Sequence, residues 1–320
     1  MSITQVGHVR PRRSHLSRGG TALVLASALT LGWGAALSAL ALSAPLSARP
    51  IPADAEVVVH IDLEAVRGSR VYRHLDKRGS LGEAKTSLDA DLAPLTADLF
   101  ADAAGLSFWA RGDGDDEAGA LIVAGADTAR MVRTISAGPG YETRKAGGHT
   151  VHGWGEGDDR TYLAVKGRWA VLSEDADDVR ATLDVLDGRR PSMSPARLRL
   201  PKRAGMMALA VFGDRALDAL QKHAESTLLN KGKLSALRLI VGEQGDSLYA
   251  QADIDTASAE EAKQVRKVMD GALALGMLSA ESPELQTLMR GISVSMKQAS
   301  IEVKLELATS QVLKWLDESK

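Results

Sequence analysis

The chain has 320 residues, of which 45% are hydrophobic, and its 39 basic and 41 acidic residues give a formal net charge of −2 at pH 7. This balance leaves no basic excess from which to build a phosphate-binding surface, so we expect no nucleic-acid partner. Cysteine is absent, which excludes disulfides, thiolate metal sites, cysteine nucleophiles and lipoprotein-type lipidation. Five Trp, four Tyr and three Phe argue against an extended stacking platform for sugars or bases.

Residues 1–48 have the layout of an export segment. Four arginines between residues 10 and 18 precede an apolar stretch, residues 21–44, that contains no charged residue. Cleavable signals have apolar runs of about 7–15 residues and spanning helices need about 20, so the stretch fits a cleaved signal peptide and a retained membrane anchor equally. Positive charge before the stretch, and none within it, places the following chain outside the cytoplasm. We therefore expect an exported protein, either periplasmic or anchored in the inner membrane, whose N-terminal segment meets the membrane.

Alternation of apolar and polar residues is the clearest pattern after residue 49. From Ile301 to Leu307 every second residue is apolar and the residues between are charged, which is typical of antiparallel strands with one buried face. Ser258 with Glu261, and Ser282 with Pro283, are signals of helix starts. In chain order, the patterns predict strand 55–62, one or two helices in 64–100, strands 104–111 and 118–125, helix 127–136, short strands up to 173, helix 175–187, strand 205–213, helix 214–229, strands 234–242 and 247–254, helices in 258–290, strands in 291–307 and helix 310–319.

Both halves of this order open as strand–helix–strand–strand–helix and finish with strands and a helix. We therefore predict an α+β fold of two similar halves, residues 49–190 and 204–320, after an N-terminal apolar helix. Each half is expected to be an antiparallel sheet with helices packed on one face. Residues 191–203, rich in proline and basic residues, are predicted to link the halves, and the pattern leaves open whether the halves share one sheet.

Two stretches resemble a group of exported bacterial proteins of unknown function. Ile51-Pro52-Ala53-Asp54-Ala55 leads into the valines of the first strand, and Lys166–Ser173 reads as a hairpin before the helix that starts at Asp175. In the proteins that the chain resembles, two repeated α+β halves open with a similar proline-led strand. The resemblance implies a duplicated fold and an exported location, and such families bring no catalytic residues to carry over.

The pattern nearest to a metal site is His149-Thr150-Val151-His152, with Glu156, Asp158 and Asp159 close behind. Histidine and carboxylate side chains are common zinc ligands. The segment reads as a strand, however, and residues three apart in a strand point to opposite faces. We therefore expect exposed hairpin histidines and no metal site.

Residues 111–117 form an acidic loop between two predicted strands, with Asp113, Asp115 and Glu117 spaced as in the first half of an EF-hand. The twelfth position of that motif, which needs a bidentate glutamate, holds Ala124. A solvated hairpin turn is the expected structure. No cofactor site is predicted here or at the glycines of residues 153–157, which lack a nucleotide-binding spacing.

No common hydrolase motif occurs in the sequence. His60, opposite the valines of its strand, and His223, beside an apolar helical stripe, are expected at the surface or between the halves. No catalytic residue is therefore predicted, and a triad assembled from distant residues stays open. Trp109, Trp154 and Trp169 fall on predicted strands, where they either line a ligand or partner groove or fill a second core beneath the helices of residues 64–100.

These patterns favour a non-catalytic protein that binds another component of the cell envelope. The alternatives are a periplasmic carrier of a lipid or other apolar ligand and a hydrolase without a sequence motif. A carrier requires an apolar cavity between sheet and helices, and a hydrolase requires a histidine beside a carboxylate and a nucleophile in a cleft. A binding protein instead requires an exposed apolar or tryptophan-bearing surface.

Overall fold

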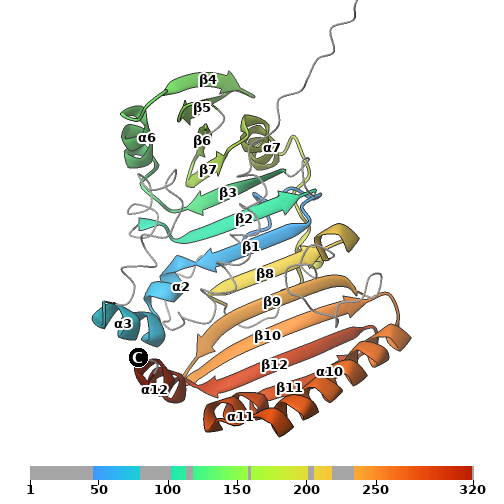
Figure 1. Cartoon of the computed structure of the whole chain (residues 1–320). Coiled ribbons are helices and arrows are strands. Elements are labelled where there is room, and N and C mark those ends of the chain that lie inside the picture. The colour runs from blue at the N-terminus through green and yellow to red at the C-terminus, as the bar shows by residue number, and fades with distance from the viewer. Residues whose placement is uncertain are drawn as a thin grey trace, which may run out of the picture.

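One antiparallel sheet runs through the whole molecule. The computed structural model describes residues 46–79, 102–112, 118–157, 160–200, 205–217 and 234–318. Its twelve strands follow the order β11-β12-β10-β9-β8-β1-β2-β3-β7-β6-β5-β4, and every neighbouring pair is antiparallel. Figure 1 shows helices α6 and α7 toward one end of this sheet and α10, α11 and α12 at the other. The predicted α+β class and antiparallel pairing are confirmed.

The elements follow the predicted order closely. The N-terminal half supplies β1 (Val57–Asp62), α2 (Leu63–Arg67), α3 (Arg70–Lys77), β2 (Gly105–Arg111), β3 (Ala118–Ala124), α6 (Thr128–Ser136), β4 (Glu142–Ala146), β5 (His149–Trp154), β6 (Thr161–Lys166), β7 (Trp169–Ser173) and α7 (Ala176–Leu186). After α8 (Pro195–Leu198), the C-terminal half supplies β8 (Met207–Phe212), β9 (Leu234–Gln244), β10 (Ser247–Thr256), α10 (Ala259–Ser279), α11 (Pro283–Arg290), β11 (Ile292–Lys297), β12 (Ser300–Ala308) and α12 (Thr309–Glu318). The parts of the predicted helices that fall in residues 80–100 and 218–229 lie outside the described residues.

The halves join at β1, which pairs with β2 on one side and with β8 on the other. Val58 lies opposite both Trp109 and Ala210 in these two ladders. Outward from this seam, each half places its first three strands in chain order and then its last strand, giving β1-β2-β3-β7 and β8-β9-β10-β12. This shared order is the spatial counterpart of the duplication read from the element order. The division into separate units at residues 191–203 stays a proposal.

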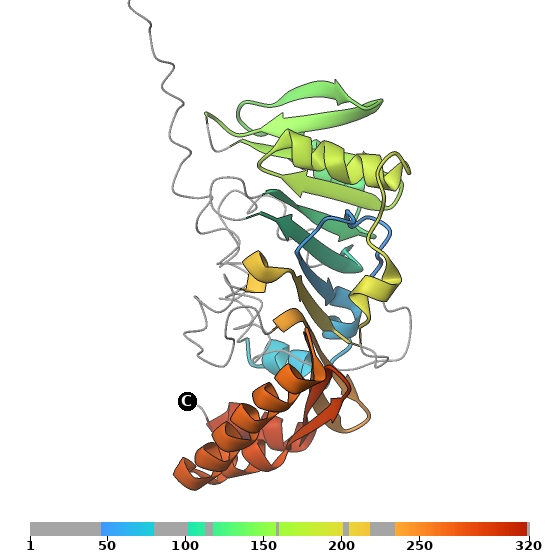
Figure 2. The ribbon, with the colours of Figure 1, turned by 90° about the vertical axis from the view of Figure 1, so that its right-hand side faces the viewer.

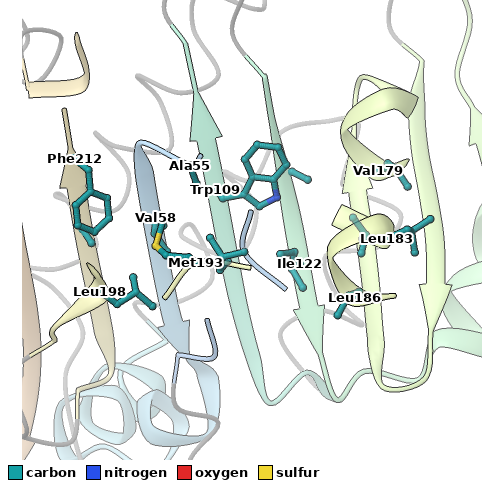
Figure 3. Packing of buried hydrophobic residues seen from close by; sticks show 14 of the residues in the cluster. Ala55, Val58, Trp109, Ile122, Val179, Leu183, Leu186, Met193, Leu198 and Phe212 are labelled. Atoms are coloured by element: carbon teal, nitrogen blue, oxygen red, sulfur yellow. The ribbon is translucent and has the colours of Figure 1, made fainter. Parts of the chain in front are cut away.

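Alternate side chains along the strands separate two faces, which we name the α7 face and the α10 face. On the α7 face, Trp109 and Ile122 are fully buried and pack with Val179 and Leu183 of α7, as Figure 3 shows. A strand that is buried on both faces of its sheet needs apolar residues at successive positions and not only at every second one. The strands β1, β2 and β3 meet this condition, so α7 finds an apolar surface there.

The opposite face, the α10 face, is covered by α10 and α6. Ala262 and Val265 of α10 pack in the cluster that contains Val59, while Met131 of α6 packs on Val123. The expected packing of helices on one face therefore holds in the C-terminal half for α10. In the N-terminal half it needs correction, because α6 and α7 take opposite faces of the same strands.

The segment predicted as a linker packs against the sheet. Met193 is 1% exposed and Leu198 is 5% exposed, and both belong to the core of the α7 face. Pro52 and Ser192 form a β-bridge that joins the segment to the residues just before β1. Figure 3 shows Met193 and Leu198 beside Val58 and Phe212. Residues 191–200, which belong to the segment predicted to link the halves, thus pack against the sheet.

Among the described residues, no helix combines the length and apolarity needed to cross a bilayer. The apolar stretch at residues 21–44, which carries the signal or anchor prediction, lies outside these residues. The acidic loop at residues 113–117, as well as Asp158, Asp159 and His223, also lies outside them. The predictions made for these positions stay predictions.

Candidate functional site

The two histidines of the metal-like pattern point to opposite faces of β5, as their spacing predicts. On one face, His149 Nε2 lies 2.8 Å from Asp187 Oδ2 at the end of α7. On the other face, the Tyr141 hydroxyl lies 2.9 Å from His152 Nδ1, and the two rings stack. Because they take different partners, the two histidines cannot ligate one ion. Within the described ranges, no three His, Asp or Glu side chains gather around a common point.

Asp187, at the end of α7, is the centre of a structural network of charged side chains. Besides His149, it pairs with Lys166 of β6 and with Arg189, whose Nη2 lies 2.6 Å from Oδ2. The Asp187 side chain is 14% exposed. Burial lowers the pKa of His149, and the nearby Lys166 and Arg189 charges lower it further. This network fastens α7 to the strands beneath it, and it places no nucleophile beside the histidine.

His60 forms the arrangement nearest to a catalytic pair, and it lies on β1, where the two halves join, which is one of the two positions expected for it. His60 Nδ1 lies 2.8 Å from Ser107 Oγ across the β1–β2 ladder. Both residues are only 5% exposed, because the α7 face is covered at this point. A hydrolytic serine must reach a substrate in a cleft. The described cleft lies elsewhere, so this pair is a satisfied polar contact of the core.

The described cleft lies between the edge strand β4 and the start of α7. It has a volume of about 500 Å³, and its lining includes Arg144, Tyr162, Asp175 and Arg180. Charged side chains of both signs dominate this lining, whereas an apolar ligand needs a mainly hydrophobic cavity. Within this lining, the guanidinium of Arg144 lies 4.5 Å from the centre of the Tyr162 ring. The cleft therefore does not have the chemistry that a lipid carrier requires.

The strand tryptophans fill cores on both faces of the sheet, so they do not line one groove. Trp109 is fully buried beneath α7, and its indole Nε1 donates to Thr182 Oγ1 at 3.0 Å. Trp154 is 6% exposed and packs on the α10 face with Met131 of α6. Trp169 is partly buried at the margin of the α7-face core. Among the helices that the structure describes, α7 and α6 cover these tryptophans. Most of the stretch 64–100, which is predicted as helices, lies outside the described residues.

Glu243, which the sequence did not single out, carries a buried carboxyl group near the C-terminal end of β9. It is 9% exposed, and its Oε1 accepts a hydrogen bond from Thr309 Oγ1 at 3.3 Å. Its Oε2 is buried and has no hydrogen-bond partner in the described part of the chain. Burial raises the pKa of Glu243 to about 7, and the Thr309 bond and the Arg70 charge only partly oppose this rise. The Glu243 carboxyl, which contacts the first residue of α12, thus keeps its proton up to a pH of about 7.

Helix α10 carries the most exposed apolar surface of the described residues. Its N-terminal half is anchored by Ala262 and Val265, but residues 271–280 contain no charged side chain at all. Figure 2 shows this orange helix slanting away from the sheet. The apolar surface consists of five side chains with their exposed fractions: Val268 50%, Leu275 69%, Met277 50%, Leu278 84% and Leu285 of α11 39%. We name this set the α10 surface.

A local sequence signal for the α10 surface exists. Residues 271–280 read GALALGMLSA, which is apolar around the whole circumference of a helix. An amphipathic surface helix buries only one stripe, so the remaining apolar side chains must face solvent or another molecule. The helix-start signal at Ser258 and Glu261 carries no information about this apolar side of the helix. Val268, Leu275 and Leu278 recur there at intervals of seven and three residues.

Comparison with known proteins supports the fold. No protein-family model matches the sequence, and no curated protein matches it either. The fold is similar to that of TP0453 in its crystal form III, with a TM-score of 0.50 and 10% identity over 88% of this chain and 100% of that one. Crystal form I of TP0453 gives a TM-score of 0.46 and 11% identity, covering 86% of this chain and 98% of that one. At such low identity the likeness shows the fold alone.

Proposed function

We propose that the chain is an exported, non-catalytic binding protein of the bacterial cell envelope, which contacts another envelope component through the α10 surface. The arginine-rich and apolar layout of residues 1–48 supports export. The partner in this proposal is an envelope protein that offers an apolar surface.

The exposure of Leu275 and Leu278 is the observation that carries the proposal. Monomeric soluble proteins rarely expose large contiguous apolar patches, and such patches mark interaction sites. Complete burial of one leucine side chain contributes about 1.5–3 kcal/mol relative to full exposure. With 69% and 84% of these side chains in water, most of that free energy is available to a partner. The polar cleft and the buried His60–Ser107 pair lend no comparable support to a carrier or a hydrolase.

Site-specific photo-crosslinking in the bacterium that makes the protein tests this proposal. A photo-reactive amino acid at Ala274, an exposed position next to Leu275 of the α10 surface, is expected to give a covalent adduct with an envelope protein. The same amino acid at Glu260, exposed at the other end of the same helix, is the matched control and is expected to give none. Mass spectrometry of the adduct then identifies the partner.

A second variant tests whether apolar contact causes the adduct. Leu275→Glu with Leu278→Glu places two charges in the surface while leaving the buried stripe of α10 unchanged. The adduct at Ala274 is expected to disappear in this variant, because burial of unpaired carboxylates is costly. Equal adducts at Ala274 and Glu260, or an adduct that survives both glutamates, would rule out the α10 surface as the binding site.

A further inference from the structure

Within the described ranges the outer edge of β11 pairs with no other strand, and the direction of its backbone groups can be assigned residue by residue. No strand of the described chain lies beyond β11 in the sheet. The Glu306 amide donates to the Gly291 carbonyl at 3.2 Å, so this carbonyl faces β12, while the Gly291 N–H donates to carbonyls of α11. Because successive residues of a strand alternate in direction, Ser293 and Ser295 also face β12. The N–H and C=O groups of residues 292, 294 and 296 therefore point outward.

The two edges of the sheet differ in how they are protected. At the far edge, β4 carries exposed charges on Glu142, Arg144 and Lys145, which is a common protection against edge-to-edge pairing. The β11 sequence, Ile-Ser-Val-Ser-Met-Lys, holds one charge, at its end, and contains no proline or bulge. An edge strand without these protections is a template for another strand. The asymmetry points to a pairing function for the β11 edge.

We propose that β11 pairs with β11 of a second copy of this chain, antiparallel about a two-fold axis at Val294, so that one sheet continues through two molecules. In this register Val294 faces its own copy, and Ile292 faces Met296. All three pairs lie among residues with outward backbone groups, so two hydrogen bonds form at each pair. On the other face, Ser293 lies opposite Ser295. No like charges meet in this register.

Self-complementarity is the reason for choosing a second copy as the partner. An isologous interface requires one patch that matches itself under a two-fold rotation. The apolar and serine positions of β11 satisfy this on both faces at the same register, and Lys297 at the end lies opposite Gly291. The axis is normal to the sheet, so the helices α10 of both copies stay on the same face. The inference is independent of the proposed function.

Cysteine crosslinking tests this register directly, because the chain contains no cysteine of its own. In a hydrogen-bonded antiparallel pair the Cα atoms are about 5.5 Å apart, which lies within the disulfide range of about 4.4–6.8 Å. Under mild oxidation of the full-length chain, Val294→Cys is expected to form a disulfide dimer. Ser293→Cys is the matched control, since the two copies of residue 293 would be about 8 Å apart.

Sedimentation of the full-length chain in a mild detergent, from micromolar to millimolar concentration, supplies the second measurement. The wild type is expected to dimerise reversibly. Val294→Pro is expected to remain monomeric, because it removes an outward N–H without removing a hydrogen bond to β12. Circular dichroism verifies its folding, and if this variant unfolds, the cysteine pair decides. A monomeric wild type, or equal crosslinking at residues 293 and 294, would overturn the proposal.

Discussion

The contact between Trp109 and Thr182 allows a sharp test of the core beneath α7. The indole Nε1 donates to the Thr182 hydroxyl at 3.0 Å, and both residues are fully buried. Thr182→Val keeps the shape of the side chain but removes the acceptor, so the indole N–H is left without a partner in a dry core. An unsatisfied buried donor costs about 1–3 kcal/mol. We expect the free energy of unfolding to fall by this amount.

A double-mutant cycle separates the hydrogen bond from general packing. Trp109→Phe removes the donor, so Thr182→Val in that background leaves no orphaned group and should cost about 0.5 kcal/mol or less. The coupling free energy between the two positions is therefore expected to be about 1–2 kcal/mol, within the range for residues in contact. Thr182→Ser, which keeps a hydroxyl, is the control and should preserve most of the coupling.

Urea unfolding at pH 7, followed by far-ultraviolet circular dichroism, measures the four free energies by linear extrapolation. The signal should come from the backbone, because Trp109→Phe changes the fluorescence. If Thr182→Val costs the same with Trp109 as with phenylalanine, the hydrogen bond does not stabilise the fold, and the position assigned to α7 over Trp109 is refuted.

Three further predictions follow from buried charge and exposed apolar groups. The pKa of Glu243 is raised from 4.5 to about 7, so its protonated form stabilises the fold fully below pH 4.5. This contribution is lost as the pH rises through 7. Glu243→Gln should therefore be more stable than wild type at pH 8 by up to about 3 kcal/mol. Arg238→Ala should lower the free energy of unfolding by about 2–4 kcal/mol, because it removes the cation that pairs with Asp255, whose Oδ2 lies 2.7 Å from Arg238 Nη1. Leu275→Glu with Leu278→Glu should change stability by about 0.5 kcal/mol or less while reducing the binding of an apolar fluorescent dye.

Matched variants accompany these measurements, all by urea unfolding. Glu260→Gln, at an exposed position, should leave the pH dependence unchanged, and identical curves for wild type and Glu243→Gln would contradict the raised pKa. Arg266→Ala removes an exposed ion pair and should cost about 0.5 kcal/mol or less; a comparable cost for Arg238→Ala would refute its buried role. Val265→Glu, in the buried stripe of α10, should unfold the C-terminal half. A similar loss from the leucine pair would show that the α10 surface is part of the core.

The element order could be predicted because its signals are local. The capping serine at residue 258 accepts a hydrogen bond from the Glu261 amide, as the sequence pattern indicates. The strict alternation of Ile301–Leu307 places the side chains of β12 on two faces without any knowledge of neighbouring strands. The same two-residue period separates His149 from His152. Each of these outcomes depends on backbone geometry within a few residues, so the sequence alone specifies it.

The candidate site could not be predicted to the same extent, because its features depend on contacts between distant residues. Asp187 reaches His149 across 38 positions of the chain, and no spacing indicates that pairing. His60 is flanked by Ser107 of β2 and Ala208 of β8, and both are far from it in the chain. The exposure of Leu278 depends on the angle at which α10 leaves the sheet. Burial is a property of the packed whole, so these residues looked unremarkable in the sequence.

By itself, the sequence determined the α+β class, the order of strands and helices, the faces of the strands and the export-like N-terminal layout, because hydrophobic period, capping and charge act over short distances. Only the tertiary structure decided that both halves share one twelve-stranded sheet, that α6 and α7 cover opposite faces, and that apolar side chains of α10 remain in water. Strand pairing and helix docking select among many arrangements that satisfy the same local pattern. That selection depends on the fit between surfaces far apart in the chain.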